Sequence, residues 1–376
     1  MIYLDNAATG GRKPDGVITA VLSAVRVCAN PGRSGHKLAL SCLQKVQDCR
    51  NALSEVFGGY GYDRVAFTKN CTEALNLALF GVLKKGDHAV TTALEHNSVL
   101  RPLKQLKNER NVEFDIAPAK EGKLSPESVL RLLKTNTKAV VVTSASNVTG
   151  YAPDLKKIRE LRPERVLLIV DGAQGGGHLP LHMRETGIDC LALAGHKGLF
   201  AIQGSGALLF SERVELSPIL YGGTGSMSFS LDMPDFSPDN LEAGTLAFPA
   251  VASLLEGVRY YQSNAEKIFM RHVVLTEYFI KGLKELKGFK PYSSPNPCGI
   301  VAFGHETIQS ELLASTLSSR YDVAVRGGLH CAPLMHESLG TSDGGLVRAS
   351  FSHFNSEAEA DVLLSALRKI SVSGVR

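Results

Sequence analysis

The sequence predicts an α/β fold, and three observations support this prediction. From about residue 64, short runs rich in β-branched residues alternate with longer segments whose apolar residues recur three and four positions apart. The runs at 138–143 (KAVVVT) and 165–170 (RVLLIV) are apolar almost throughout, which is typical of strands covered by helices on both faces. After residue 250 a long helical pattern leads into a few further strands. We therefore expect a large domain with a mainly parallel sheet flanked by helices, and a smaller α+β domain.

The order of the predicted elements follows this pattern. Seven segments are expected to form the strands of the large sheet: 64–68, 88–92, 112–116, 138–143, 165–170, 189–194 and 206–210. Amphipathic helices are expected between some of them, at 72–85 and 125–136. The later elements are a long helix from about 249, strands at 299–303, 321–326 and 346–351, and helices near 308–320 and from about 356. The large domain is predicted to span 16–249, and the smaller one to combine 1–15 with 250–376.

Length and composition narrow the class of protein. A chain of 376 residues suits one large domain with a smaller companion. Hydrophobic residues make up 44% and charged residues 21%, and the net charge of +4 is dispersed, which favours a folded protein with no nucleic-acid partner. No apolar run approaches the roughly 18 residues of a membrane span, and the N-terminus lacks a secretory pattern. We expect a cytoplasmic enzyme with no membrane partner.

Cysteine use points away from disulfides and metal sites. The seven cysteines form no C-x-x-C pair, so we expect neither a disulfide framework nor a structural zinc site. Cys331 stands out in VRGGLHCAPLMH (325–336), after two glycines and a histidine. Local spacing leaves three roles open for it: a nucleophile, a metal ligand, or a small apolar residue in a turn. The spacing of His330, Cys331 and His336 matches no common zinc pattern.

Two junctions of the predicted sheet carry polar residues suited to binding and chemistry. At the start of the helix after 64–68, Asn70 can cap the helix with Glu73 three residues on, and the same N–H groups can bind a phosphate. Asp171 ends a buried strand, where an acid needs a metal, a ribose hydroxyl or a protonated ring nitrogen as partner. Lys197 follows the next strand. It is either a surface lysine or a Schiff-base lysine whose cofactor pairs with Asp171.

Ten motifs in this order resemble the class V aminotransferase group of fold-type I pyridoxal-phosphate enzymes, and within it the cysteine desulfurase and selenocysteine lyase branch. They cover nearly the whole chain: YLDNAAT (3–9), NPGRSGHKLA (30–39), NCTEALN (70–76), ALEHNSVLRP (93–102), SNVTG (146–150), VDGAQ (170–174), GHKG (195–198), EAGT (242–245), RGGLHCA (326–332) and VRASFSHFN (347–355). The first implication is a pyridoxal 5'-phosphate cofactor held by Lys197 as a Schiff base, with Asp171 keeping its ring nitrogen protonated.

The resemblance also implies roles for the other matching residues. The further cofactor contacts would be Cys71 and Thr72 with His196 at the phosphate, His96 on the ring face, Gln174 and Asn147 at the ring hydroxyl, and Thr245 from the partner subunit of a homodimer with shared active sites. The substrate contacts would be Arg348, paired with the carboxylate through two hydrogen bonds, with Asn147, His36, Asn6 and Arg326. One position departs from the family pattern: Ala194 stands where a hydroxyl residue usually helps to bind the phosphate. Its loss is expected to cost about 1 kcal/mol of cofactor affinity.

The implied reaction converts L-cysteine to L-alanine, and Cys331 accepts the sulfur as a persulfide. RGGLHCA resembles the short-loop form of the family's cysteine motif, which favours transfer of the sulfur to a dedicated acceptor protein. Three alternatives remain open: a selenocysteine lyase that acts on L-selenocysteine, a true aminotransferase, and a catalytically idle scaffold that has kept the fold.

Overall fold

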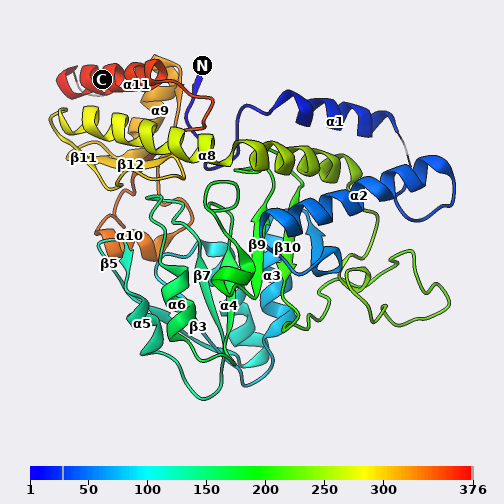
Figure 1. Cartoon of the computed structure of the whole chain (residues 1–376). Coiled ribbons are helices and arrows are strands. Elements are labelled where there is room, and N and C mark those ends of the chain that lie inside the picture. The colour runs from blue at the N-terminus through cyan, green and yellow to red at the C-terminus, as the bar shows by residue number, and fades with distance from the viewer. Residues whose placement is uncertain (28, 374–376) are drawn as a thin grey trace.

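The computed structural model of the chain describes residues 1–27 and 29–373. Cys28, in the predicted large domain, and residues 374–376, in the predicted smaller domain, lie outside the described residues. In this part of the chain, seven strands form the large sheet in the order β2-β10-β9-β8-β7-β3-β4 (Figure 1). Their bounds are Val65–Thr68 (β2), His88–Thr92 (β3), Glu113–Ala117 (β4), Thr137–Thr143 (β7), Leu167–Asp171 (β8), Cys190–Ala194 (β9) and Gly206–Phe210 (β10). All seven predicted strands are confirmed. Of these, β10 runs antiparallel to both its neighbours and the other pairs are parallel.

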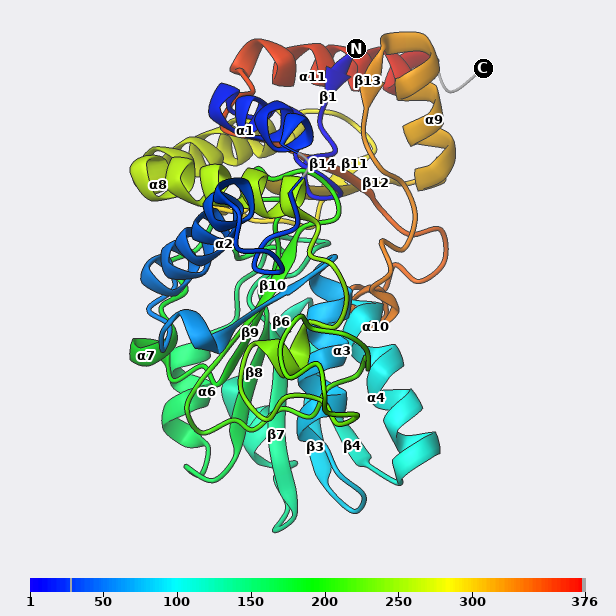
Figure 2. The same cartoon turned by 90° about the vertical axis from the view of Figure 1, so that its right-hand side faces the viewer.

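The sheet is covered on both faces because side chains along its strands alternate between two cores. In β7, Val140 and Val142 belong to one cluster of buried residues, and Ala139 and Val141 belong to the other. The first cluster includes residues of the helices α2 (Lys37–Val56), α6 (Leu155–Leu161) and α8 (Phe248–Lys284). The second includes residues of α3 (Cys71–Val82) and α4 (Asn97–Arg110), which lie on the opposite side from α6 in Figure 2. This packing explains the continuous apolar runs of the central strands.

The parallel strands end together at one edge of the sheet. Four neighbouring strands end there at Thr92, Thr143, Asp171 and Ala194. In open α/β sheets this edge collects ligand-binding residues, because strand ends and helix starts converge on it. The helix α3 begins just beyond the end of β2, so its N-terminus lies at the same edge.

A second group of elements surrounds a smaller sheet. The long helix α8 leads into a three-stranded sheet of β11 (Phe289–Pro291), β12 (Ile300–His305) and β14 (Val347–Ser350), all labelled in Figure 2. Strand β1 (Ile2–Tyr3) pairs in parallel with β13 (Val323–Ala324), so the first residues of the chain lie among the last elements. The helices α9 (Ser310–Tyr321) and α11 (Glu357–Ser373) complete this group, and both were predicted. The division into domains at 15 and 249 stays a prediction.

One predicted helix is shorter than expected. The helix predicted over 125–136 ends early, as α5 (Pro126–Leu130). Beyond it, Leu133 N donates to Leu130 O and Thr137 N donates to Lys134 O, each at 3.1 Å and each across three residues, so the chain turns into β7. The remaining elements are α1 (Asp15–Arg26), α7 (Met183–Thr186), α10 (Pro333–Leu339), β5 (Ala119–Lys120), β6 (Lys123–Leu124) and two 3-10 turns at Tyr62–Arg64 and Asp239–Leu241. Within the described residues, no helix has both the length and the apolar character that crossing a membrane requires.

Candidate active site

The start of α3 places a buried thiol against an acid at the sheet edge. Asn70 caps the helix as predicted, since its Oδ1 accepts a hydrogen bond from Glu73 N at 2.9 Å. Cys71 is buried directly after this cap, and its thiol donates to Asp171 Oδ1 at 3.4 Å. Burial, together with the neighbouring carboxylate, holds the pKa of Cys71 well above its usual range. The thiol is therefore a neutral donor that supports Asp171.

Asp171 and Lys197 come from the ends of adjacent strands, β8 and β9. Asp171 Oδ1 accepts from Cys71 and from Ala173 N, the latter at 2.8 Å, which leaves Oδ2 for a further donor. Burial lowers the pKa of Lys197, and the carboxylate of Asp171 opposes this shift. A lysine with a lowered pKa more readily provides the neutral amine that covalent catalysis requires.

One cavity joins most of the predicted site residues. The predicted residues that line it are Cys71, Thr72, His96, Asn147, Asp171, Gln174, His196 and Lys197, together with Ala194. Ser98 also lines it, and its hydroxyl lies 2.8 Å from Thr72 Oγ1 and 2.9 Å from His96 Nδ1. Burial lowers the pKa of His96, which favours a neutral imidazole. The cavity therefore presents hydroxyl donors, a neutral imidazole, an acid and a lysine to the same space.

The N-terminal segment fixes the peptide that precedes Lys197. The carbonyl oxygen of His196 accepts from Gly10 N at 2.9 Å, Lys13 Nζ at 3.2 Å and Thr9 Oγ1 at 3.3 Å. Burial lowers the pKa of Lys13 to about 8. Burial, with the charges of Lys197 and Lys13, lowers the pKa of His196 to about 4, so this imidazole is neutral. Sequence reasoning missed Thr9 and Lys13, because their target is a backbone carbonyl nearly two hundred residues away.

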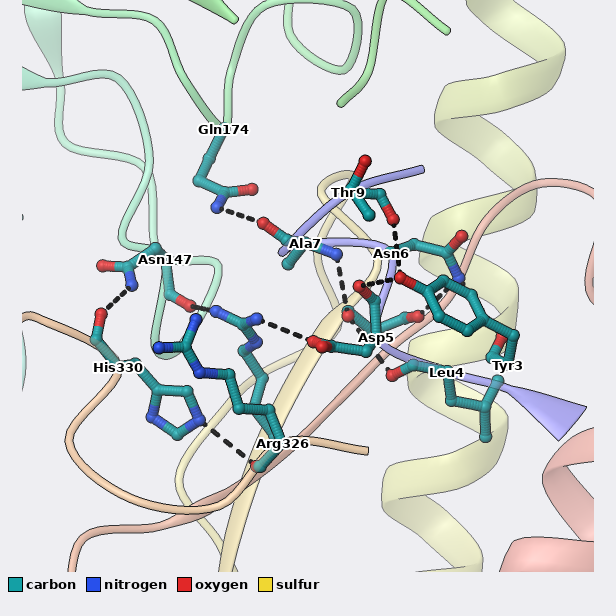
Figure 3. Close-up of polar contacts among 12 residues, drawn as sticks. Tyr3, Leu4, Asp5, Asn6, Ala7, Thr9, Asn147, Gln174, Arg326 and His330 are labelled. Atoms are coloured by element: carbon teal, nitrogen blue, oxygen red, sulfur yellow. Dashed lines mark hydrogen bonds and ion pairs between the residues drawn. The ribbon is translucent and has the colours of Figure 1, made fainter. Parts of the chain in front are cut away.

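Asn147 lies between the cavity and the segment that carries Cys331. Its side-chain Nδ2 donates to His330 O at 2.8 Å, and its own backbone oxygen accepts from Arg348 Nη1 at 2.9 Å (Figure 3). Arg348 is fully buried, and its Nη2 donates to Asp5 Oδ1 at 2.9 Å while Nε has no partner. A buried guanidinium with unused N–H groups is suited to an anionic ligand.

Gln174, on the wall of the Lys197 cavity, also has an unused polar atom. Its Nε2 donates to Ala7 O at 3.1 Å, and its buried Oε1 has no hydrogen-bond partner.

Cys331 lies on an exposed turn beside the cavity. It is exposed, whereas the other described cysteines are buried. Cys331 and His330 both have positive φ, 57° and 52°, a conformation that costs about 1–2 kcal/mol in a residue other than glycine. A groove lined by Cys331 shares Thr72, His96 and Ser98 with the Lys197 cavity. The exposed thiol is therefore adjacent to the site.

Six predicted residues do not line this cavity: Cys331 and Arg348, described above, and Thr245, His36, Asn6 and Arg326. Thr245 lines a separate cavity with Phe67 and the 241–247 segment, and His36 is an exposed N-cap of α2. Asn6 and Arg326 lie near Arg348: Asn6 Nδ2 donates to Ser350 O at 2.9 Å, and the Arg326 backbone pairs with that of Arg348. The predicted contacts of Thr245 with the phosphate, and of His36, Asn6 and Arg326 with the substrate, therefore require a second subunit or a ligand that reaches beyond the cavity.

Glu95 is a buried acid that the sequence analysis did not single out. Its Oε1 accepts from Thr92 Oγ1 at 2.5 Å and from Thr143 N at 3.0 Å, which ties together the ends of β3 and β7 just before His96. Its Oε2 is buried without a partner. Burial raises the pKa of Glu95 from 4.5 to about 8, so it is protonated at neutral pH. The sequence places this acid directly before His96, but it does not show that the acid is buried.

We predict that Glu95→Gln stabilises the protein in a pH-dependent way. The raised pKa means that folding binds a proton between about pH 4.5 and pH 8, so the wild-type free energy of unfolding falls as pH rises through this window. Glutamine mimics the protonated acid and does not titrate. The two proteins should match near pH 4, and the variant should be more stable by on the order of 3 kcal/mol at pH 8. Denaturant unfolding at both pH values measures this. Glu109→Gln, at an exposed site, is the control; a pH-independent effect of Glu95→Gln would contradict the prediction.

The residues of the cavity fit pyridoxal phosphate. Asp171 has an oxygen left for a protonated ring nitrogen, Gln174 has an unpaired buried Oε1, and Lys197 lines the same cavity. Hydroxyl groups and the N-terminus of α3 lie along the wall where a phosphate would bind. In the described part of the chain, no group of three or more His, Cys, Asp or Glu side chains is placed to hold a metal ion.

Fold and cavity together define an α/β enzyme of fold type I, and comparison with known proteins gives its family. The chain belongs to the class-V aminotransferase family, whose model matches residues 2–363. A probable cysteine desulfurase of Methanothermobacter thermautotrophicus is 32% identical, with 99% of this chain and 95% of that protein covered. A probable cysteine desulfurase of Pyrococcus abyssi is 31% identical, with 98% and 94% covered.

A solved structure gives the same result. The apo structure of a cysteine desulfurase from Thermococcus onnurineus has a TM-score of 0.90 to this chain at 27% identity, with 99% of this chain and 94% of that chain covered. The fold class expected from the sequence and the resemblance to the cysteine desulfurase branch are thereby confirmed.

Proposed function

We propose that this chain is a pyridoxal-phosphate-dependent cysteine desulfurase, which converts L-cysteine to L-alanine and takes the sulfur onto Cys331. The observation that carries the proposal is the wall shared by two sites. Thr72, His96 and Ser98 line both the cavity of Lys197 and the groove of Cys331. A nucleophilic thiol is thus placed beside a site suited to an amino-acid substrate.

Different residues of the cavity would bind different parts of the cofactor. Lys197 would bond to it covalently, Asp171 Oδ2 would accept from its ring nitrogen, and His96 would pack on its ring face. Thr72, His196 and the N–H groups at the start of α3 would hold the phosphate. Ser98 adds a hydroxyl on the same wall, which can offset the hydroxyl missing at Ala194. Asn147 and Gln174 would contact the ring hydroxyl.

When bound, pyridoxal phosphate supplies a covalent attachment for the substrate amine and an electron sink that weakens the bonds at Cα. The buried Arg348 would bind the substrate carboxylate with its unused N–H groups. Lys197 Nζ, whose pKa burial lowers, would take the proton from Cα. The Cys331 thiolate would then attack the substrate sulfur. An S–S bond forms, the C–S bond breaks with its electron pair left on carbon, and protonation of that carbon gives alanine.

We also propose a homodimer with shared active sites. The 219–236 segment exposes large apolar side chains, among them Phe229 at 108%, Leu231 at 106% and Tyr221 at 75% relative exposure. Such a concentration of exposed apolar surface is typical of an interface. Thr245 lies outside the cavity of its own chain, as expected of a residue that serves the partner. Sedimentation of the cofactor-loaded protein should give twice the monomer mass; a monomer would contradict this proposal.

A thiol that works as a sulfur carrier must stay reduced between turnovers. We therefore propose a cytoplasmic location, where thiols are kept reduced, and an acceptor protein that removes the sulfur from Cys331. The exposure of Cys331 supports delivery to a macromolecular partner.

Alanine release from L-cysteine and from L-selenocysteine tests the proposed function. The cofactor-loaded protein should release alanine from L-cysteine and leave sulfur on Cys331. Release from L-selenocysteine alone would indicate a selenocysteine lyase instead. Conversion of the cofactor to its amine form without alanine would indicate an aminotransferase.

A further inference from the structure

The turn that carries Cys331 is attached at both ends to different parts of the fold. Before the cysteine, Gly328 N donates to Ser310 Oγ at 3.0 Å, and Gly328 O accepts from Leu346 N at 3.1 Å. Gly327 packs so closely on Ser310 that an added Cβ would lie 2.5 Å from its carbonyl oxygen. This half of the turn is therefore fixed to α9 and to the chain before β14.

The second half is attached, through two consecutive carbonyls, to the loop after β7 and to the start of α4. His330 O accepts from Asn147 Nδ2 at 2.8 Å, and Cys331 O accepts from the backbone N–H of Asn97 at 2.8 Å. Asn147 follows β7 and lines the Lys197 cavity, while Asn97 is the first residue of α4. Figure 3 shows the Asn147 amide directed at the His330 carbonyl. His330 and Cys331 are the non-glycine residues of this turn with positive φ, so the two hydrogen bonds act where the backbone conformation is least favourable.

We infer that Asn97, through its backbone N–H, and Asn147, through its side chain, are positioning residues that clamp the Cys331 turn against the cavity. The inference rests on the proposed function for its meaning, because it assigns a purpose to the position of the sulfur-accepting thiol. A backbone held in a strained conformation reverts to others unless its surroundings maintain it. The two hydrogen bonds of the clamp restrain His330 and Cys331, the residues whose positive φ is unfavourable. Asn147 also lines the cavity, so the thiol and the bound substrate are held by the same side chain.

One of the two hydrogen bonds, from Asn97 N to Cys331 O, can be removed by a single substitution. Asn97 is at the first helical position of α4, where proline is favoured, and proline lacks the N–H that reaches Cys331 O. The preceding residue, His96, has φ −72° and ψ 154°, which is the conformation that a following proline prefers. Asn97→Pro therefore removes this donor with little disturbance of the helix, and its ring Cδ, which replaces the amide hydrogen, also displaces the Cys331 carbonyl oxygen that lies 2.8 Å from the Asn97 nitrogen. Asn97→Ala is the matched control, because it keeps the N–H and removes only the side chain.

Hydrogen exchange of the cofactor-loaded protein tests the clamp. In Asn97→Pro the amides of residues 329–332 should exchange at least about five-fold faster than in Asn97→Ala, since the loss of one hydrogen bond alone corresponds to ~1 kcal/mol. Asn147→Ala, which removes the other donor, should also accelerate exchange of the turn, and it provides the test if the proline variant does not fold. Equal exchange of the turn in Asn97→Pro and Asn97→Ala would overturn the inference.

The rate of sulfur transfer separates this inference from the proposed function. In a single turnover with L-cysteine, Asn97→Pro should form the persulfide on Cys331 several-fold more slowly, while the absorbance of the bound cofactor and the melting temperature match those of Asn97→Ala. A purely structural role of Asn97 would lower cofactor loading or melting temperature instead, and would contradict the clamp. If the wild-type protein forms no persulfide but the exchange difference is present, the proposed function fails and the clamp stands.

Discussion

Replacement of Lys197 by alanine should abolish the covalent attachment of the cofactor. It should also lower the rate of alanine formation by about 10²- to 10⁴-fold, the contribution that a positioned acid or base typically makes. Lys197 lies in the cavity with Asp171, and its amine has a pKa lowered by burial. Among the residues that the structure describes, Lys197 is the one lysine that lines that cavity. Loading of pyridoxal phosphate is measured by absorbance, and alanine release by chromatography.

The control for this variant is an exposed lysine. Lys156→Ala, on α6, should leave the cofactor spectrum and alanine release unchanged. Stable covalent loading of the Lys197→Ala protein, with turnover close to that of wild type, would show that another group performs the chemistry. Addition of a small external amine should restore part of the activity, because the cavity of the variant keeps its other walls.

Replacement of Cys331 by alanine should produce the second large effect, a loss of sulfur transfer from L-cysteine with no change in cofactor loading. Cys331 lies on the exposed turn and contributes no side-chain hydrogen bond to the cavity, so its thiol is expected to matter only for the sulfur. Alanine release from L-cysteine should fall by at least 10²-fold, while release from L-selenocysteine is retained. If the Cys331→Ala variant released alanine from L-cysteine at the wild-type rate, Cys331 would have no part in the reaction.

The sequence predicted the large sheet well, because its strands are set by local composition. Runs such as 138–143 are apolar at successive positions and rich in β-branched residues, which is typical of strands covered by helices on both faces. The helix at 125–136 was predicted too long because its apolar spacing continues past Leu130, whereas hydrogen bonds such as that of Lys134 N to Thr137 Oγ1 turn the chain into β7.

The motifs named most of the polar residues that line the Lys197 cavity, but not the contacts that these residues make. The motifs indicated Cys71 as a phosphate ligand, and the structure shows its thiol donating to Asp171. The motifs also indicated Asn147 as a ligand of the cofactor, and its amide donates to His330 O, 183 residues away. Side-chain direction and long-range hydrogen bonds depend on how distant segments pack, so a motif that names the residue does not specify its partner.

The presence of sulfur on Cys331 during turnover tests the central claim most directly. After incubation of the cofactor-loaded protein with L-cysteine, rapid alkylation and mass spectrometry of the peptide that contains Cys331 should show one added sulfur atom on this residue. The buried cysteines, such as Cys49 and Cys190, should be unmodified in the same sample. An unmodified Cys331 in a sample that is releasing alanine would contradict the proposed function.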